Sequence, residues 1–397
     1  MRSLFTCVAA TGHFHPLVPF ARALVEAGHR VAFATHAALA PLVERAGFQH
    51  LPAGADPTGP KAAAVLGEMS ALPPAEQKVF AAPRLFADVL APAMATDLLA
   101  VLEDWPADLL VHDNTEIAAG LVAERLGLPH AAISVVATGI DPTVRAAIAE
   151  PVAALRAAHG LPPDPALAML RGDLALHPFP PSFLDPVPGG PAAATYFVRP
   201  APFDRSGDEG LPAWVDDLPA RPTVYATLGT AFNGRADLFA AFLAGLRDEP
   251  VNLIVTVGRD QDPAQFGPQP SHVRIARYIP QTLLFPRCDL VLTHGGSGTV
   301  MAALAHGLPL VLVPIAADQP DNAARCAALG VGRVVEARDV TPQAIRDAVR
   351  GVLADPAYYR HAGRLRGEIL RLPEAHHAVP LLEQLAGEEC RYAAATA

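Results

Sequence analysis

Two short segments place histidine next to glycine directly after an apolar run, and both patterns suit chemistry at the end of a β-strand. The first is TGHFHP, in which His13 and His15 follow the apolar residues 4–9. The second is THGGSGTV, residues 293–300, which follows CDLVLT and precedes the helix-like MAALAHG. An imidazole can take up a proton near neutral pH, or donate a hydrogen bond when it is neutral. Proton abstraction and anion binding are therefore the chemistries to test.

The glycine-rich segment has the composition of an anion-binding loop. A loop that leaves a strand and enters a helix presents free backbone N–H groups, and the helix dipole adds partial positive charge there. Glycines let an anion approach the backbone closely. The pattern predicts phosphate binding by His294 and by the loop residues Gly296, Ser297, Gly298 and Thr299. A plain tight turn is the alternative that the loop alone leaves open.

Both segments stand in an alternating series of strands and helices. Buried strands are predicted at residues 4–9, 31–35, 108–113, 130–136, 223–229, 251–258, 288–293 and 308–315. Helical periodicity or loops lie between them, which predicts βαβ units and parallel sheets. Such sheets bind ligands at the carboxyl ends of their strands, where both histidine segments lie. Residues 51–90 are less regular and rich in proline, which predicts mobile loops.

The composition limits the function classes. The chain has 397 residues, 51% of them apolar and 18% charged, so it can bury two cores of ordinary size. A net charge of −10 argues against nucleic-acid binding. The four cysteines lack metal-ligand spacing and indicate a reducing compartment. The uncharged stretch 290–317 is broken by glycine and proline. We therefore expect a cytoplasmic protein without a membrane span.

The segments around the glycine loop carry a family resemblance. They read RYIPQTLLFPRCDLVLTHGGSGTV and PIAADQPDNAARC. With ATGHFHPLVPFARALVEAGHRVAFAT at the start and VYATLGTAFN after residue 222, they make nearly the whole chain resemble the family-1 glycosyltransferases. The nearest likeness is to the actinobacterial, calicheamicin-type enzymes that decorate antibiotics and other natural products. The resemblance implies the GT-B fold, an α/β architecture of two doubly wound, Rossmann-like parallel-sheet domains facing a central cleft.

The resemblance and the composition together predict the domain boundaries. Residues 1–199 would form the acceptor-binding domain and 222–373 the nucleotide-sugar-binding domain. The polar, proline-rich stretch 200–221 is typical of a linker. Residues 374–397, with VPLLEQLAGEE, are predicted to form a helix that returns to the N-terminal domain, as in similar proteins.

The resemblance also implies a donor site in the second domain. Tyr278 would pack against the base, although an ordinary half-buried aromatic is the alternative. The backbone of Ile279 and the side chain of Gln281 would bind the nucleoside. His294 and the loop amides would hold the diphosphate, helped by the hydroxyl of Thr230. Two further residues would bind sugar hydroxyls: Asp318, for which a helix cap is the alternative, and Gln319.

One departure from the family bears on the nucleotide. In some members, a glutamate three residues after the Ser or Thr of this loop binds the ribose hydroxyls. Here that position, counted from Thr299, is Ala302. Alanine cannot pair with a 2′-hydroxyl, and a deoxyribose has none to pair. The sequence therefore favours a dTDP-sugar over a UDP-sugar.

The same resemblance assigns the catalytic residues. His13 would take the proton of the acceptor, and Asp113, at the end of a later strand, would orient it. Asp108 starts that strand and would lie at its other end. His112 is predicted to be structural, because alternation points it away from Asp113. His15 would line the acceptor site or pack within its loop.

The implied reaction is attack on the anomeric carbon with inversion. Negative charge grows on the leaving diphosphate, and backbone dipoles would stabilise it. No metal and no cofactor beyond the nucleotide-sugar co-substrate are expected, and the pair Asp216–Asp217 is typical of a solvated acidic turn.

Two other functions remain open. A nucleotide-sugar epimerase would use the same phosphate loop, and a catalytically silent homologue would bind and activate a partner. The apolar first half favours an apolar acceptor such as a polyketide. The expected partners are thus the donor and a small acceptor, in a monomer or homodimer. The identity of the acceptor and of the sugar, and O-, N-, S- or C-linkage of the product, are left open by the sequence.

Overall fold

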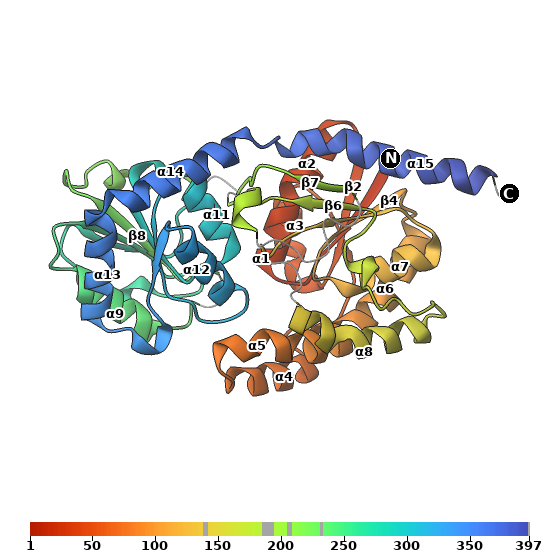
Figure 1. Ribbon diagram of the computed structural model, residues 1–397, viewed down its shortest axis with the longest axis horizontal. Helices are drawn as coiled ribbons and strands as arrows, with labels where there is room; N and C mark the ends of the chain where they lie inside the picture. The colour runs from red at the N-terminus through yellow and green to blue at the C-terminus, as the bar shows by residue number, and fades with distance from the viewer. Residues whose placement is uncertain (138–141, 185–193, 205–208, 231–232, 396–397) are drawn as a thin grey trace. The chain divides into compact units, whose positions relative to one another are not determined.

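The computed structural model divides the chain into two compact units, each built on one parallel sheet (Figure 1). It describes residues 1–137, 142–184, 194–204, 209–230 and 233–395. Unit 1 comprises residues 1–179, 184–203 and 372–397. Unit 2 comprises residues 180–183 and 204–371. The boundary between them falls at Phe203–Asp204, inside the polar stretch.

Unit 1 contains a seven-stranded sheet in the order β3-β2-β1-β4-β5-β6-β7. Its strands are β1 (Arg2–Thr6), β2 (Arg30–Thr35), β3 (Gln49–Pro52), β4 (Leu109–Asp113), β5 (His130–Ile133), β6 (Leu174–His177) and β7 (Ala194–Phe197). Its helices are α1 (Thr11–Phe14), α2 (Val18–Glu26), α3 (Ala40–Arg45), α4 (Pro60–Ser70), α5 (Pro74–Ala81), α6 (Ala91–Asp104), α7 (Ile117–Leu126), α8 (Pro142–Ala158) and α15 (Val379–Ala395).

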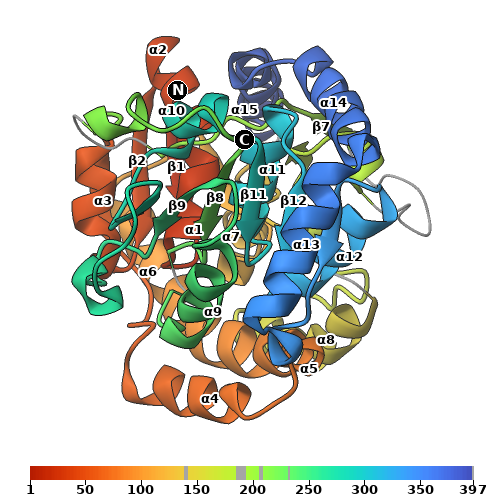
Figure 2. The same cartoon turned by 90° about the vertical axis from the view of Figure 1, so that its left-hand side faces the viewer.

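Unit 2 contains a six-stranded sheet in the order β10-β9-β8-β11-β12-β13, and Figure 2 shows β9, β8, β11 and β12 side by side. Its strands are β8 (Thr223–Thr227), β9 (Asn252–Thr256), β10 (Val273–Ala276), β11 (Leu290–Thr293), β12 (Leu310–Leu312) and β13 (Gly332–Val334). Its helices are α9 (Ala236–Leu246), α10 (Gln281–Leu284), α11 (Ser297–Ala305), α12 (Gln319–Ala328), α13 (Pro342–Ala354) and α14 (Pro356–Arg371).

In each sheet, the direction in which the chain adds successive strands reverses between two neighbouring strands. In unit 1 the chain proceeds outward from β1 to β3 on one side and from β4 on the other. In unit 2 the same reversal falls between β8 and β11, which pair directly at Thr227 and Thr293. Helices leave the sheet in opposite directions at such a point, so the carboxyl ends of the two strands stay open to a ligand. The predicted α/β, doubly wound architecture is confirmed in both units.

Apolar side chains on both sheet faces hold unit 1 together. Phe5, Phe33 and Leu24 lie in a core that also takes Leu382 from α15. The opposite face packs Leu4 and Leu110 against α6 and α7. The last helix of the chain is therefore part of the N-terminal unit's core, because its apolar stripe is buried there.

The expectation of loops at residues 51–90 is wrong. That segment forms α4, α5 and a π-helical turn from Ala82 to Leu90 that runs into α6. Pro83 lies within a continuous helical run, where its π-helical part begins, and Pro60 and Pro74 stand in the first turns of α4 and α5. Proline fits that position because the first helical N–H groups have no intrahelical acceptor.

One helical run passes a simple length and composition test for a membrane span. It extends from Glu76 to Asp104 and includes most of α5, the π-helical segment and all of α6. Core helices of globular domains pass the same test. Met94, Ala95 and Leu98 of this run lie in the core of unit 1, so the run packs as a core helix does.

Candidate active site

The first site lies where β1 and β4 end. Thr6 of β1 is paired with His112 of β4, so the chain that leaves β1 passes beside Asp113. His13 follows on α1, and its Nδ1 lies 3.3 Å from Asp113 Oδ2. The carboxyl group is fully buried, and the histidine side chain is 21% exposed. A solvent-facing imidazole is thus held against a buried carboxyl group.

Asp113 is held by five donors and is poised as a carboxylate. Oδ2 accepts from the Val8 amide as well as from His13, and Oδ1 accepts from the hydroxyl of Thr115 and from the amides of Thr115 and Glu116. Burial raises the pKa of Asp113, but the neighbouring His13 and these hydrogen bonds together lower it by more than that. The net pKa of Asp113 therefore lies below its usual value. The carboxylate can therefore orient and stabilise an imidazolium.

Thr115 is a residue that the sequence analysis missed. Its Oγ1 lies 2.5 Å from Asp113 Oδ1 and 3.1 Å from His13 Nδ1. Because the hydroxyl donates to the carboxylate, its lone pairs are free to accept from Nδ1–H. Nδ1 is then the protonated nitrogen of His13, and Nε2 carries the lone pair that can take a proton. The sequence signal that could have identified Thr115 is its place two residues after the Asp that ends a predicted strand.

The structure also places three further residues that the sequence analysis considered: Asp108, His112 and His15. Asp108 accepts from the Arg2 amide at the opposite end of the strands. His112 is buried, donates from Nδ1 to the Asp113 carbonyl, and contacts His130 Nδ1 through Nε2 at 3.1 Å. His15 packs its ring against Phe14 and edge-on against Phe203, as a loop-packing residue does.

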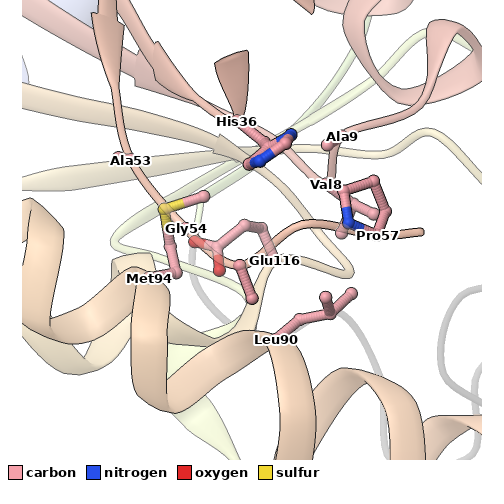
Figure 3. Close-up of a pocket in the computed structure, with 10 residues that line it drawn as sticks. Val8, Ala9, His36, Ala53, Gly54, Pro57, Leu90, Met94 and Glu116 are labelled. Carbon is pink, nitrogen blue, oxygen red and sulfur yellow. The ribbon is translucent and has the colours of Figure 1, made fainter. Parts of the chain in front are cut away.

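A mostly apolar pocket adjoins Asp113 (Figure 3). Two of its lining residues, Val8 and Glu116, donate their backbone N–H groups to the Asp113 carboxylate. The other lining residues are Ala9, His36, Ala53, Gly54, Ala55, Pro57, Leu90 and Met94. Burial and the Asp113 charge raise the pKa of Glu116 to about 8, although its oxygens accept from the Ala118 and Ala119 amides. Below about pH 8, the pocket thus combines apolar walls with the neutral carboxyl group of Glu116.

The second site lies where β8 and β11 end in unit 2. After Thr293 the chain turns through Gly295, whose φ is +91°, and enters α11 at Ser297. Gly296 stands at the N-cap, and in the described part of the chain no side chain caps the first-turn amides of α11. That phosphate binds to the amides of Gly296 to Thr299 stays a prediction.

His294 is buried beside this loop. An ideal Cβ built on Gly229 or Gly296 would lie 2.7 or 2.6 Å from its Nε2, so the imidazole lies between two glycine positions. Burial lowers the pKa of His294 to about 4, which keeps the ring neutral at physiological pH. Its Nδ1 lies 3.1 Å from the Thr293 hydroxyl, which accepts from the Gly295 amide. When the Thr293 hydroxyl donates to Nδ1, the single proton of the neutral ring lies on Nε2, which can donate a hydrogen bond.

Thr230 and Gln281 lie on the same carboxyl edge. Thr230 is exposed in the loop after β8, next to Gly229. Gln281 donates from Nε2 to Thr299 Oγ1 at 3.2 Å, which ties the start of α10 to the first turn of α11. Its carbonyl oxygen is thereby left to accept a hydrogen bond.

Tyr278 is committed to contacts within unit 2. Its hydroxyl donates to the Asp204 carbonyl, and the Arg259 guanidinium lies 3.8 Å from its ring centroid. One face of the ring is therefore covered, and a base could stack only on the other. Ile279 beside it is buried.

The predicted sugar ligands lie at the start of α12. Asp318 occupies the N-cap position but makes no capping bond; its Oδ2 instead accepts from Ser297 Oγ at 2.6 Å and from Asn322 Nδ2 at 2.7 Å. The helix-cap alternative is therefore wrong. Gln319 accepts through Oε1 from the Ile315 and Ala316 amides, which leaves its NH₂ group to donate.

Comparison with known proteins places these features in a family. The family described as the C-terminal domain of erythromycin biosynthesis protein CIII-like proteins matches residues 242–385. The chain is 33% identical to 4'-demethylrebeccamycin synthase of Lentzea aerocolonigenes, over 97% of this chain and 99% of that protein. It is 29% identical to 10-deoxymethynolide desosaminyltransferase of Streptomyces venezuelae, over 98% of each.

Solved structures agree. The glycosyltransferase VinC in complex with dTDP has a TM-score of 0.79 and 27% identity, over 98% of this chain and 100% of that one. The calicheamicin glycosyltransferase CalG4 has a TM-score of 0.79 and 25% identity, over 97% and 98%. The fold is that of a GT-B glycosyltransferase. The chain belongs to the actinobacterial natural-product glycosyltransferases of family 1, which confirms the resemblance predicted from its motifs.

Proposed function

We propose that this enzyme transfers a sugar, with inversion and without a metal ion, from a dTDP-sugar to a hydroxyl group of an apolar natural product. The observation that carries the proposal is the His13–Asp113–Thr115 arrangement at the carboxyl ends of β1 and β4. It provides a base with a defined unprotonated nitrogen.

The donor half of the proposal rests on the loop of unit 2. His294 and the α11 amides supply hydrogen-bond donors for a departing diphosphate, and the helix dipole adds partial positive charge. Since these groups stabilise the leaving group, the proposed reaction needs no metal and no cofactor besides the nucleotide-sugar. Asp318 Oδ1 and the Gln319 NH₂ group would bind sugar hydroxyls.

The thymidine nucleotide is favoured by two observations. Ala302 is buried on α11 and offers no partner for a ribose 2′-hydroxyl. Two similar structures contain this nucleotide: VinC with dTDP, and SsfS6 of Streptomyces sp. SF2575 with thymidine diphosphate at 26% identity. The relatives' names, a rebeccamycin synthase and macrolide sugar transferases among them, support a natural-product acceptor.

The proposed reaction moves one proton and breaks one bond. His13 Nε2 takes the acceptor's hydroxyl proton while that oxygen attacks the anomeric carbon from the face opposite the nucleotide. The bond from this carbon to the diphosphate oxygen breaks, and its electron pair leaves with dTDP. Asp113 stabilises the imidazolium that forms.

Substitution of His13 by Ala tests the proposal. Loss of a general base typically costs about 10²–10⁴-fold in rate, so transfer should fall by that factor. Thermal stabilisation by dTDP should be retained, and it should exceed that by UDP; a ligand at about a hundred times its Kd adds about 2.7 kcal/mol. Turnover close to wild type would overturn the base assignment.

Release of dTDP without an acceptor would favour an epimerase, and loss of transfer in EDTA would contradict metal independence.

A further inference from the structure

The side chain of Asn322 connects the diphosphate loop to the proposed sugar carboxylate. It lies on α12, one turn after Asp318, and is 1% exposed. Its Nδ2 is 2.9 Å from the Gly295 carbonyl oxygen, 3.1 Å from Ser297 Oγ and 2.7 Å from Asp318 Oδ2. All three neighbours accept hydrogen bonds, so the amide nitrogen must face them.

These acceptors come from two segments that bind different parts of a nucleotide-sugar. Gly295 and Ser297 belong to the loop between β11 and α11, whose amides face the diphosphate in the proposed function. Asp318 starts α12 and is a proposed sugar ligand. The Ser297 hydroxyl closes the arrangement by donating to Asp318 Oδ2 at 2.6 Å. A single buried amide therefore sets the spacing between the two segments.

The arrangement also determines which Asp318 oxygen can serve a ligand. Oδ2 receives two donors, from Ser297 and Asn322, and the structure shows no protein donor to Oδ1 in the described part of the chain. Two donors on one oxygen fix the plane of the carboxylate. The other oxygen then projects with its lone pairs available for sugar hydroxyls.

We infer that Asn322 is a positioning residue for the donor sugar, acting through Asp318 and the glycine loop. The inference rests on the proposed function, since it takes Asp318 and the loop to be donor ligands. Without the Asn322 amide, Asp318 loses one of its two fixed donors and the loop carbonyl of Gly295 loses its partner. The site then has to be ordered by the ligand itself, which weakens binding.

The test compares Asn322→Ala with a matched control, Asn252→Ala. Asn252 is also 1% exposed in unit 2, and its Nδ2 also reaches three oxygens, those of Pro219, Arg221 and Thr223, at the start of β9. Both variants should lose similar thermal stability. Only Asn322→Ala should weaken binding of the dTDP-sugar, by about tenfold or more, with a smaller effect on dTDP alone. Equal affinity in the two variants would overturn the inference.

A double-variant cycle separates this inference from the proposed function. If Asn322 acts through Asp318, Asn322→Ala should add no more than about twofold to the effect of Asp318→Ala. Independent, multiplying effects would contradict the inference while leaving the donor site in place. If instead Asp318→Ala and His294→Ala both leave dTDP-sugar affinity unchanged, the proposed donor site itself is wrong.

Asn322→Asp keeps the inference testable if the alanine variant does not fold. The new carboxyl group would stand where an amide nitrogen lay 2.7 Å from Asp318, and two carboxylates so close cannot both ionise. A shared proton restores the hydrogen bond as the pH falls. The ratio of variant to wild-type Kd for the dTDP-sugar should therefore decrease between pH 8 and pH 6, and a constant ratio would count against the positioning role.

Discussion

At the residue scale, the hydroxyl of Thr115 helps to define the tautomer of His13, the proposed base. It donates to Asp113 Oδ1 and leaves a lone pair for His13 Nδ1, 3.1 Å away. Asp113 Oδ2 lies on the other side of the same Nδ1–H, at 3.3 Å. The two acceptors together hold the imidazole with Nε2 unprotonated, as a proton-accepting role requires.

Thr115→Val should therefore lower kcat by about tenfold, because a general base acts only in its correct tautomer and orientation. Valine keeps the shape of threonine and removes only the hydroxyl. The KM for the dTDP-sugar should stay the same, since Thr115 belongs to unit 1 and the proposed donor ligands to unit 2. Steady-state kinetics measure both constants. Thr115→Ser keeps the hydroxyl and should retain kcat, so an equal loss in both variants would argue against the role.

At the element scale, the loops after β8 and β11 depend on each other. Gly229 has a φ of +72°, and an added Cβ would meet His294 Cε1 at 2.6 Å. The loop after β8 can lie against the imidazole only because this position has no side chain. The loops that follow β8 and β11 therefore pack against each other and form one surface.

Gly229→Ala should weaken dTDP binding by about tenfold or more, because the new methyl group displaces His294 from its place beside the α11 amides. Isothermal calorimetry measures this affinity. Gly267→Ala is the matched control: Gly267 has a φ of +66° in the same unit, but a Cβ there would meet no atom within 4 Å. Both variants carry the left-handed backbone cost of about 1–2 kcal/mol, and only the first should lose affinity.

At the scale of the whole molecule, α15 makes the two ends of the chain into one unit. Leu382 is buried in the same core as Phe5 and Leu24, more than 350 positions earlier in the sequence. An amphipathic helix is stable in water only when its apolar side is covered, and here the first unit covers it.

Leu382→Ala should destabilise unit 1 by about 2–4 kcal/mol, the usual cost of removing a buried leucine side chain. Hydrogen exchange should show faster exchange in β1 and β2 and unchanged exchange in β8 and β9. Leu246→Ala, which removes a fully buried leucine of unit 2, should give the opposite pattern. If Leu382→Ala acted on unit 2 instead, the assignment of residues 374–397 to the N-terminal domain would be wrong.

Acid should destabilise both units. Burial lowers the pKa of His112, His130 and His294 to about 4, against an ordinary value of 6.5, so the folded protein keeps these rings neutral. As the pH falls from 6.5 to 4, the unfolded chain binds protons at these histidines that the folded chain does not, so their contribution to stability decreases. Glu116, whose pKa is raised to about 8, offsets part of this loss in unit 1. For His294 the loss approaches about 3 kcal/mol at pH 4.

Denaturant unfolding at several pH values between 7.5 and 4.5 measures this slope. His112→Asn retains an N–H group that can donate to the Asp113 carbonyl but cannot titrate. Its free energy of unfolding should depend less on pH than that of the wild type. An unchanged slope would show that His112 does not contribute.

The order of amino acids already determines the parallel sheets and the placement of both histidine segments at strand ends, and it predicts an anion-binding glycine loop. These features are local: each depends on the periodicity of one run or on a few consecutive residues. The same local reasoning failed for residues 51–90, because a proline that starts a helix looks like one that breaks it.

Contacts between residues that are far apart in the sequence were not predicted in this way. Thr115 and His13 are separated by 102 positions, Asn322 and Gly295 by 27, and Gly229 meets His294 only because β8 and β11 are neighbours. No local pattern records such contacts, since they follow from strand order and from which side chains the packed sheet brings together. The residue types predict a base and a phosphate loop. The packed fold determines which nitrogen of His13 is protonated, which oxygen of Asp318 accepts from the described protein donors, and where the buried Asn322 amide lies.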